Sequence, residues 1–176
     1  MGPKQKKLDI HFTGVAYDRR YPVVWCGFTS FVGDLLWTFD PKTKNFKSMG
    51  FTKIREEEEI KIHRGMHVGP DELVYFGTAS LITIPRRRET PGGRLFRFHP
   101  TTGQSEYLGR PLKNDYIQTI EVDHNRGIVY GATWPMARFF AWDLEKKKLI
   151  FEEYIADWPH QLRIDDAGNC WGSYAT

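Results

Sequence analysis

GGRLFRFHPTTG, residues 92–103, has the pattern of a short aromatic strand that runs into a tight turn, and the sequence contains this pattern three times. The other copies are DLLWTFDPKTK at residues 34–44 and ARFFAWDLEKK at residues 137–147. In each copy an aromatic residue comes immediately before a polar one, and turn-forming residues follow. An Asp at the start of a turn accepts hydrogen bonds from backbone N–H groups two residues on, which closes a hairpin. A hairpin that recurs at long spacing predicts a repeat architecture.

Further strands accompany each of these hairpins. The first strands of the repeated units are predicted at residues 10–16, 62–68, 117–122 and 161–164. The second strands are short and apolar, end at a glycine, and are predicted at residues 23–27, 74–77, 129–131 and 170–172. The last strands are predicted at residues 46–50, 104–109 and 148–154. Helical periodicity is nearly absent, so the sequence predicts an all-β chain with units of four strands.

Antiparallel units of four strands are typical of the blades of a β-propeller. The succession of a turn, Val74-Tyr-Phe-Gly-Thr78, a gap, Arg94-Leu-Phe-Arg-Phe98 and Pro100-Thr-Thr-Gly103 resembles blades of the broad SMP-30/virginiamycin-lyase/propeller polysaccharide-lyase group. The resemblance covers nearly the whole chain and specifies architecture better than activity. We therefore expect residues 1–176 to form a single β-propeller domain.

The predicted ring is incomplete, because the chain holds about three and a half blades whereas propellers have roughly four to eight. Three arrangements remain open from the sequence. The chain is part of a longer polypeptide, or a second copy completes the ring as a homo-oligomer, or the sheets form a small open assembly. Two copies would supply strands for about seven blades, which is a ring size within the usual range.

The composition excludes several classes of protein. A formal charge of +3 is too small to predict nucleic-acid binding. No apolar run approaches the roughly 18 residues of a membrane span, and the basic, polar N-terminal residues contain no apolar core of a signal peptide. Cys26 and Cys170 both lie in apolar strand patterns, which favours buried thiols. These features favour a cytoplasmic location.

The repeats also predict which side chains converge. In a propeller the first strand of each blade lines the central channel, and the residues after the second-strand glycine face the same opening. Counting back from the glycines aligns one set of residues on the first strands: Thr13, Arg64, Gln118 and His160. The positions before them are His63, Ile117 and Pro159, and a third aligned set is His67, Glu121 and Arg163. Among the residues after the glycines are Thr78, Thr133, Trp134 and Tyr174.

A funnel with these side chains would be polar with an aromatic wall, which suits a carbohydrate or a small anionic ligand. Arg64 would hold a carboxylate group and Trp134 would stack on a sugar ring. Gln118, Thr78 and Thr133 would make further contacts with the ligand.

The sharper hypothesis is a polysaccharide lyase that acts on uronic-acid sugars. Removing a proton next to a uronate carboxylate requires a base whose pKa lies near neutrality, and His160 or His63 would serve. The negative charge that develops needs a nearby cation, for which Arg64 is the candidate. Tyr174 would be the acid.

Two other functions are consistent with the sequence. The same face could hold a protein, in a scaffold without catalytic activity. A metal-dependent hydrolase of the SMP-30 type would need Glu, Asn and Asp ligands at the channel, of which only Glu121 lies in a suitable register. The sequence assigns no metal site, although a divalent metal held by His63 or His160 with ligands from other units remains open.

Overall fold

The computed structural model describes residues 9–17, 20 and 22–173, and it is all-β. The strands that precede and form the first two hairpins are β1 (Asp9–Tyr17), β2 (Val24–Ser30), β3 (Leu36–Asp40), β4 (Asn45–Ser48), β5 (Lys61–Val68), β6 (Val74–Ala79), β7 (Leu95–His99) and β8 (Gln104–Gly109). The remaining strands are β9 (Tyr116–Asp123), β10 (Ile128–Trp134), β11 (Arg138–Asp143), β12 (Lys148–Tyr154), β13 (Gln161–Ile164) and β14 (Cys170–Ser173). Two 3-10 segments, η2 (Phe51–Lys53) and η3 (Ile84–Glu89), lie in connections. The predicted strands are confirmed, with ends that differ by at most a few residues.

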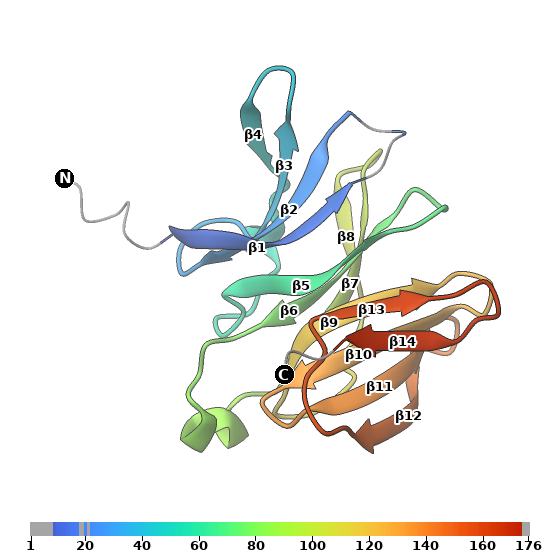
Figure 1. Ribbon diagram of the computed structural model, residues 1–176. Helices are drawn as coiled ribbons and strands as arrows, with labels where there is room; N and C mark the ends of the chain where they lie inside the picture. The colour runs from blue at the N-terminus through green and yellow to red at the C-terminus, as the bar shows by residue number, and fades with distance from the viewer. Residues whose placement is uncertain (1–8, 18–19, 21, 174–176) are drawn as a thin grey trace.

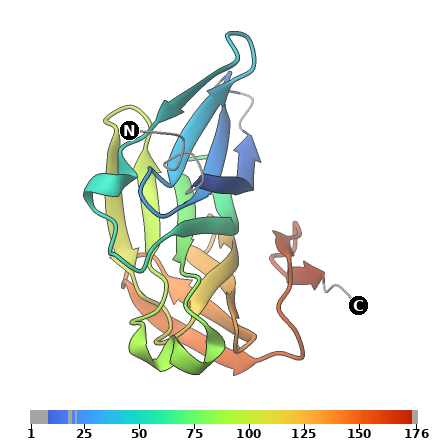
Figure 2. The same cartoon turned by 90° about the vertical axis from the view of Figure 1, so that its left-hand side faces the viewer.

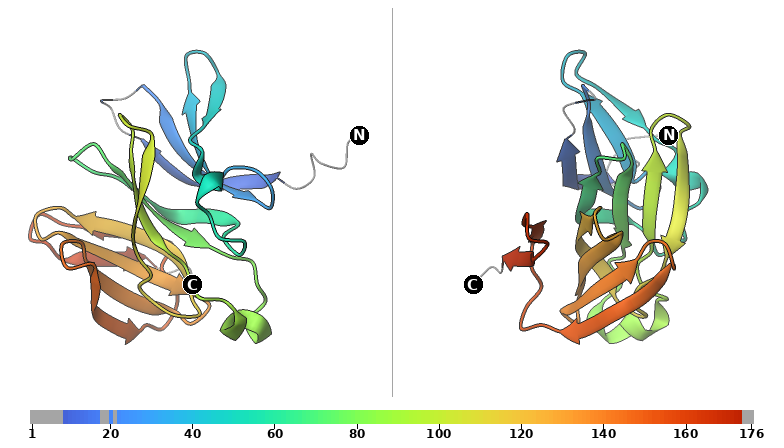
Figure 3. Two further views of the ribbon diagram at one scale, coloured as in Figure 1. Left: turned by 180° about the vertical axis from the view of Figure 1, so that it is seen from behind. Right: turned by 90° about the vertical axis from the view of Figure 1, so that its right-hand side faces the viewer.

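Consecutive strands pair antiparallel in three groups of four: β1–β4, β5–β8 and β9–β12. A short contact between Thr29 and Lys61 joins the first two groups into one eight-stranded sheet. The groups follow one another in space in chain order, as Figure 1 shows and the view from behind repeats (Figure 3). The β13–β14 hairpin forms a separate two-stranded sheet that projects from the rest (Figure 2).

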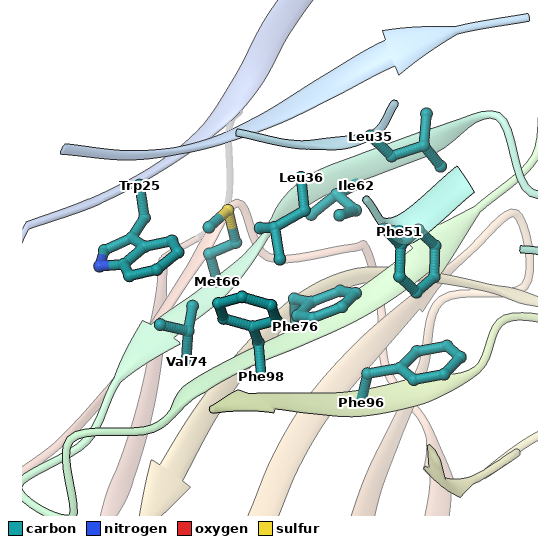
Figure 4. Close-up of a cluster of buried hydrophobic side chains, with 10 residues drawn as sticks. All are labelled: Trp25, Leu35, Leu36, Phe51, Ile62, Met66, Val74, Phe76, Phe96 and Phe98. Carbon is teal, nitrogen blue, oxygen red and sulfur yellow. The ribbon is translucent and has the colours of Figure 1, made fainter. Parts of the chain in front are cut away.

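The hydrophobic core is divided between the groups of strands. One cluster lies between the first and second groups and includes Trp25, Phe51 and Phe76 (Figure 4). A second cluster lies between the second and third groups and includes Tyr75 and Phe140. Because neighbouring residues of a strand face opposite sides, Tyr75 and Phe76 of β6 enter different clusters. All six residues of β6 are therefore buried, whereas β4 is exposed throughout and β12 almost throughout.

Glycines allow successive groups of strands to approach closely. A Cβ atom added to Gly27 would lie 2.7 Å from Cγ2 of Ile62, and one added to Gly77 would lie 2.3 Å from Cγ2 of Ile117. In both cases the isoleucine belongs to the first strand of the next group. The strands continue beyond these glycines, which were predicted to end them, and each glycine is the place where the next group packs.

We expect Gly77→Ala to lower the free energy of unfolding by about 1–3 kcal/mol, because the added methyl group would overlap the buried Ile117 side chain. Gly65→Ala is the matched control, since its added Cβ would meet its nearest neighbour at an ordinary 3.4 Å. Urea denaturation of both variants measures the difference. Equal stabilities would show that the sheets do not meet at Gly77.

No helix in the described part of the chain has the length and apolar character needed to cross a membrane.

Candidate functional site

The register of β5 and β9 decides which predicted residues meet. Ile62 pairs with Thr78, and Ile117 pairs with Thr133 in the same way, so His63 and Gln118 occupy equivalent positions. The alignment by glycines had instead matched Arg64 with Gln118. A register error of one residue moves a side chain to the opposite face of a strand. His63, and not Arg64, therefore shares a face with Gln118.

His63 and Gln118 line one cavity together with aromatic side chains. The cavity has a volume of about 200 Å³, and its lining includes Lys61, His63, Tyr116, Gln118, Trp134 and Trp158. Its residues come from β5, the end of β6 and the segment after it, β9, the end of β10 and the segment before β13. Three residues of the predicted site, His63, Gln118 and Trp134, are thus brought together.

Aromatic rings form one wall of this cavity. Tyr116 and Trp134 stack, with ring centres 5.9 Å apart and planes 21° from parallel. Trp158 meets Trp134 edge to face, with ring centres 6.5 Å apart. Burial raises the pKa of Tyr116, and its hydroxyl donates a hydrogen bond to the carbonyl oxygen of Ile82 at 3.2 Å. Tyr116 therefore remains a neutral phenol and contributes a ring surface.

Two nitrogen-bearing side chains, those of Lys61 and His63, also line the cavity. Burial, and secondarily the charge of Arg64, lowers the pKa of Lys61, so an anionic ligand would stabilise its ammonium form. The backbone N–H of Arg64 donates a hydrogen bond to Nδ1 of His63 at 2.8 Å. In a neutral imidazole that accepts at Nδ1, the proton resides on Nε2. His63 is therefore a hydrogen-bond donor through Nε2.

The other predicted catalytic and carboxylate-binding residues lie elsewhere. Arg64 is exposed and is not among the residues that line the cavity. His160 is half-buried, and its backbone N–H donates to the carbonyl oxygen of Ser173 at 3.1 Å, at the base of the β13–β14 hairpin. Tyr174, the predicted acid, lies outside the described residues. The cationic side chain at the cavity is therefore Lys61, and not Arg64 as predicted.

Thr78 and Thr133 have a different role from the predicted ligand contact. Both are fully buried, and each hydroxyl donates to a carboxylate: Thr78 to Glu59 at 2.6 Å and Thr133 to Asp115 at 2.9 Å. The same carboxylates accept hydrogen bonds from an arginine: Arg94, which immediately precedes β7, or Arg138, which begins β11. We call each set of Thr, carboxylate and Arg a buried clamp, and it holds the start of the hairpin strand against its neighbours.

A second and larger cavity, of about 790 Å³, opens between β5, β9 and the β13–β14 hairpin. It contains the third aligned set: Glu121 bonds Nδ1 of His67 through Oε1, and its Oε2 accepts from Arg163 at 2.9 Å. The predicted alignment is correct at this end of the strands. An irregularity in the pairing of β5 between Ile62 and Met66 separates the two registers.

Sequence reasoning missed Lys61, Tyr116 and Trp158 as members of the smaller cavity. Tyr116 and Lys61 each begin a first strand, one residue before the predicted range of that strand. Trp158 precedes the aligned Pro159 by one residue. With His63 instead of Arg64 matched to Gln118 and His160, the positions two residues earlier are Lys61, Tyr116 and Trp158, which form one aligned set.

Comparison with known proteins identifies a shared fold. No protein-family model and no curated protein matches the sequence. The chain is similar to the extracellular domain of a putative one-component system from B. thetaiotaomicron, with a TM-score of 0.61 and 18% identity over 91% of this chain and 19% of the other. It is also similar to hydrazine synthase of Kuenenia stuttgartiensis, with a TM-score of 0.56 and 13% identity over 91% of this chain and 40% of the other.

A third similar structure is the extracellular domain of a putative hybrid two-component system from B. thetaiotaomicron, with a TM-score of 0.59, 11% identity, and coverage of 90% of this chain and 19% of the other. The chain spans less than half the length of each of these proteins. At such identities the likeness concerns the fold alone.

Proposed function

We propose that this chain contributes blades to a β-propeller and binds a carbohydrate that carries a carboxylate, or a similar small anion, in the cavity of Lys61, His63 and Trp134. One observation supports the proposal: aromatic rings and several polar nitrogen donors line the same cavity of about 200 Å³. The three groups of four consecutive strands support the propeller. The ring would be completed by a second copy or by a complementing chain.

The cavity offers the chemistry that a sugar acid requires. The apolar face of a sugar ring packs well on a large aromatic surface, which Trp134 and Trp158 provide. The ammonium of Lys61 would pair with the carboxylate, and the Gln118 amide would bond to hydroxyl groups. His63 would donate through Nε2. Each part of a uronate thus has a partner.

The arrangement favours binding over the lyase reaction. A general base needs an available lone pair within reach of the proton that it removes. At His63 the Nδ1 lone pair accepts the Arg64 N–H, and in the neutral ring Nε2 carries the proton. Lyase activity remains the second candidate, because Lys61 could stabilise the developing charge in place of Arg64.

Trp134→Ala is expected to weaken binding of uronate oligosaccharides about tenfold, because removal of the indole abolishes stacking. Isothermal titration calorimetry with oligogalacturonate measures the change. Trp171→Ala is the matched control, since Trp171 is 63% exposed on β14, away from the cavity. Equal losses in the two variants, or no binding by the unaltered chain, would contradict the proposal.

The same titration separates an acidic from a neutral ligand. Lys61→Met should abolish the preference for oligogalacturonate over a neutral oligosaccharide and leave binding of the neutral sugar unchanged. The absorbance of unsaturated products reports lyase activity in parallel. If the unaltered chain forms unsaturated products and His63→Ala does not, the protein is a lyase and not only a binding protein. If the chain binds proteins in preference to all sugars, the scaffold function is favoured.

A further inference from the structure

We propose that His67 and His124 form a binding site for a divalent metal that prefers nitrogen ligands, such as Zn²⁺. The site lies in the larger cavity and is separate from the proposed sugar site. Nε2 of His67 and Nε2 of His124 lie 3.2 Å apart, while the ring centres are 5.2 Å apart. The nitrogen-bearing edges of the two rings therefore face one another. They come from segments 57 residues apart in the sequence, so the fold brings them together.

Carboxylates lie behind both imidazoles. Nδ1 of His67 is bonded to Glu121, which fixes the proton of a neutral ring on Nδ1 and leaves the lone pair on Nε2. Nδ1 of His124 lies 3.8 Å from Oδ2 of Asp71, and that negative charge likewise favours a proton on Nδ1. Histidine ligands of metals are typically backed in this way by a carboxylate on the second ring nitrogen.

With the proton on Nδ1 of both rings, the two Nε2 lone pairs would point toward one place, which a cation could occupy. A Zn²⁺ ion about 2.0–2.1 Å from both nitrogens would see them at an angle of roughly 100°, close to tetrahedral. Imidazole nitrogen suits Zn²⁺, Cu²⁺ and Ni²⁺ better than Mg²⁺ or Ca²⁺, which prefer oxygen ligands. The geometry therefore favours a transition metal.

The rest of the coordination shell would be open. In the part of the chain that the structure describes, no third His, Cys, Asp or Glu joins these two at one point. The cavity of about 790 Å³ provides room for water or for a ligand at the remaining positions. Arg126 and Arg163 also line it, and their charges would attract an anionic ligand to the metal.

The backbone is adapted to the position of the His124 ring. A Cβ atom added to Gly69 would lie 2.2 Å from Oδ1 of Asp71, 2.4 Å from Cε1 of His124 and 2.7 Å from Nε2 of His124. A side chain at residue 69 would thus displace both the His124 ring and the carboxylate behind it, and would change the distance between the two Nε2 atoms. Gly69→Ala consequently tests the geometry while both ligands remain in the sequence.

We expect calorimetric titration with Zn²⁺ to show one site per chain, which His124→Gln and Gly69→Ala each weaken at least tenfold. Glu121→Gln should weaken it about 10–100-fold, as found when the carboxylate behind a metal-bound histidine is removed. His99→Ala, at the end of β7, is the control and should bind like the unaltered chain. Co²⁺ should give the intense visible absorption of a tetrahedral site.

Thermal unfolding followed by circular dichroism verifies that each variant is folded, and Zn²⁺ should raise the melting temperature of the unaltered chain but not of His124→Gln. Absence of saturable Zn²⁺ binding by the folded, unaltered chain would overturn the proposal. The proposal would also be overturned if Zn²⁺ bound with equal affinity to the unaltered chain, His124→Gln and Gly69→Ala. The contact between the two imidazoles would then be a hydrogen bond and not a metal site. Neither result depends on sugar binding.

Discussion

Replacing Arg138 by alanine is expected to lower the free energy of unfolding by about 3–5 kcal/mol, because it leaves the carboxylate of Asp115 buried without its counter-charge. The Asp115 side chain has no exposed surface. Nε of Arg138 donates to Oδ2 of Asp115 at 2.7 Å, and the same oxygen accepts from the Thr133 hydroxyl at 2.9 Å. Arg138 also bonds to Glu152 at 2.6 Å. Its loss therefore removes the side-chain bonds from β11 to Asp115, which precedes β9, and to Glu152 of β12.

Chemical denaturation of Arg138→Ala and of Arg86→Ala measures this effect. Arg86 also pairs with a carboxylate, that of Glu89, but both side chains are mostly exposed, so its removal should leave the midpoint unchanged. The double variant Arg138→Ala with Asp115→Ala should lose less than the sum of the single variants, because no unpaired charge remains. If the buried clamp does not stabilise the fold, Arg138→Ala will be as stable as Arg86→Ala. The losses of unfolding free energy in the two single variants will then add up to that of the double variant.

Phe76→Ala is expected to cost a similar amount, about 3–5 kcal/mol, through a cavity in the core. Phe76 has no exposed surface. Its ring stacks on Phe96, with centres 5.4 Å apart, and meets Phe51 edge to face at 5.2 Å (Figure 4). Because the surrounding rings come from η2 and β7, the vacated space cannot close without movement of two separate segments.

Denaturation of Phe76→Leu and Ile84→Ala sets the scale for this loss. Leucine retains most of the buried volume, so Phe76→Leu should lose clearly less than Phe76→Ala. Ile84 is 56% exposed in η3, and its truncation should have little effect. Equal stabilities of Phe76→Ala and Ile84→Ala would contradict the packing of Phe76 between the first two groups of strands.

Strand positions followed from the sequence because they depend on local features. Alternation of apolar residues and turn residues such as those after Asp40 and Asp143 both act within a few residues. In the structure the carboxylate of Asp40 accepts from the backbone N–H of Lys42, and that of Asp143 from Lys146. The all-β class and the hairpins were therefore predictable without any knowledge of long-range contacts.

The candidate site was predicted only in part, because it depends on register. His63, Gln118 and Trp134 were predicted to share one site and they line one cavity, while the irregularity in β5 between Ile62 and Met66 places Arg64 outside it. Such an irregularity changes which residues face one side of the sheet and leaves the composition of the strand unaltered. Sequence patterns alone do not locate it.

The sequence by itself determined that this chain consists of antiparallel strands in repeated units of four, since hydrophobic period and turn chemistry are local. Only the tertiary structure decided which side chains meet. It placed Lys61 beside the aromatic wall, enclosed Thr78 and Thr133 in buried clamps, and directed His67 toward His124. These contacts join residues far apart in the chain, and their positions depend on strand register and on how closely the sheets can approach at their glycines.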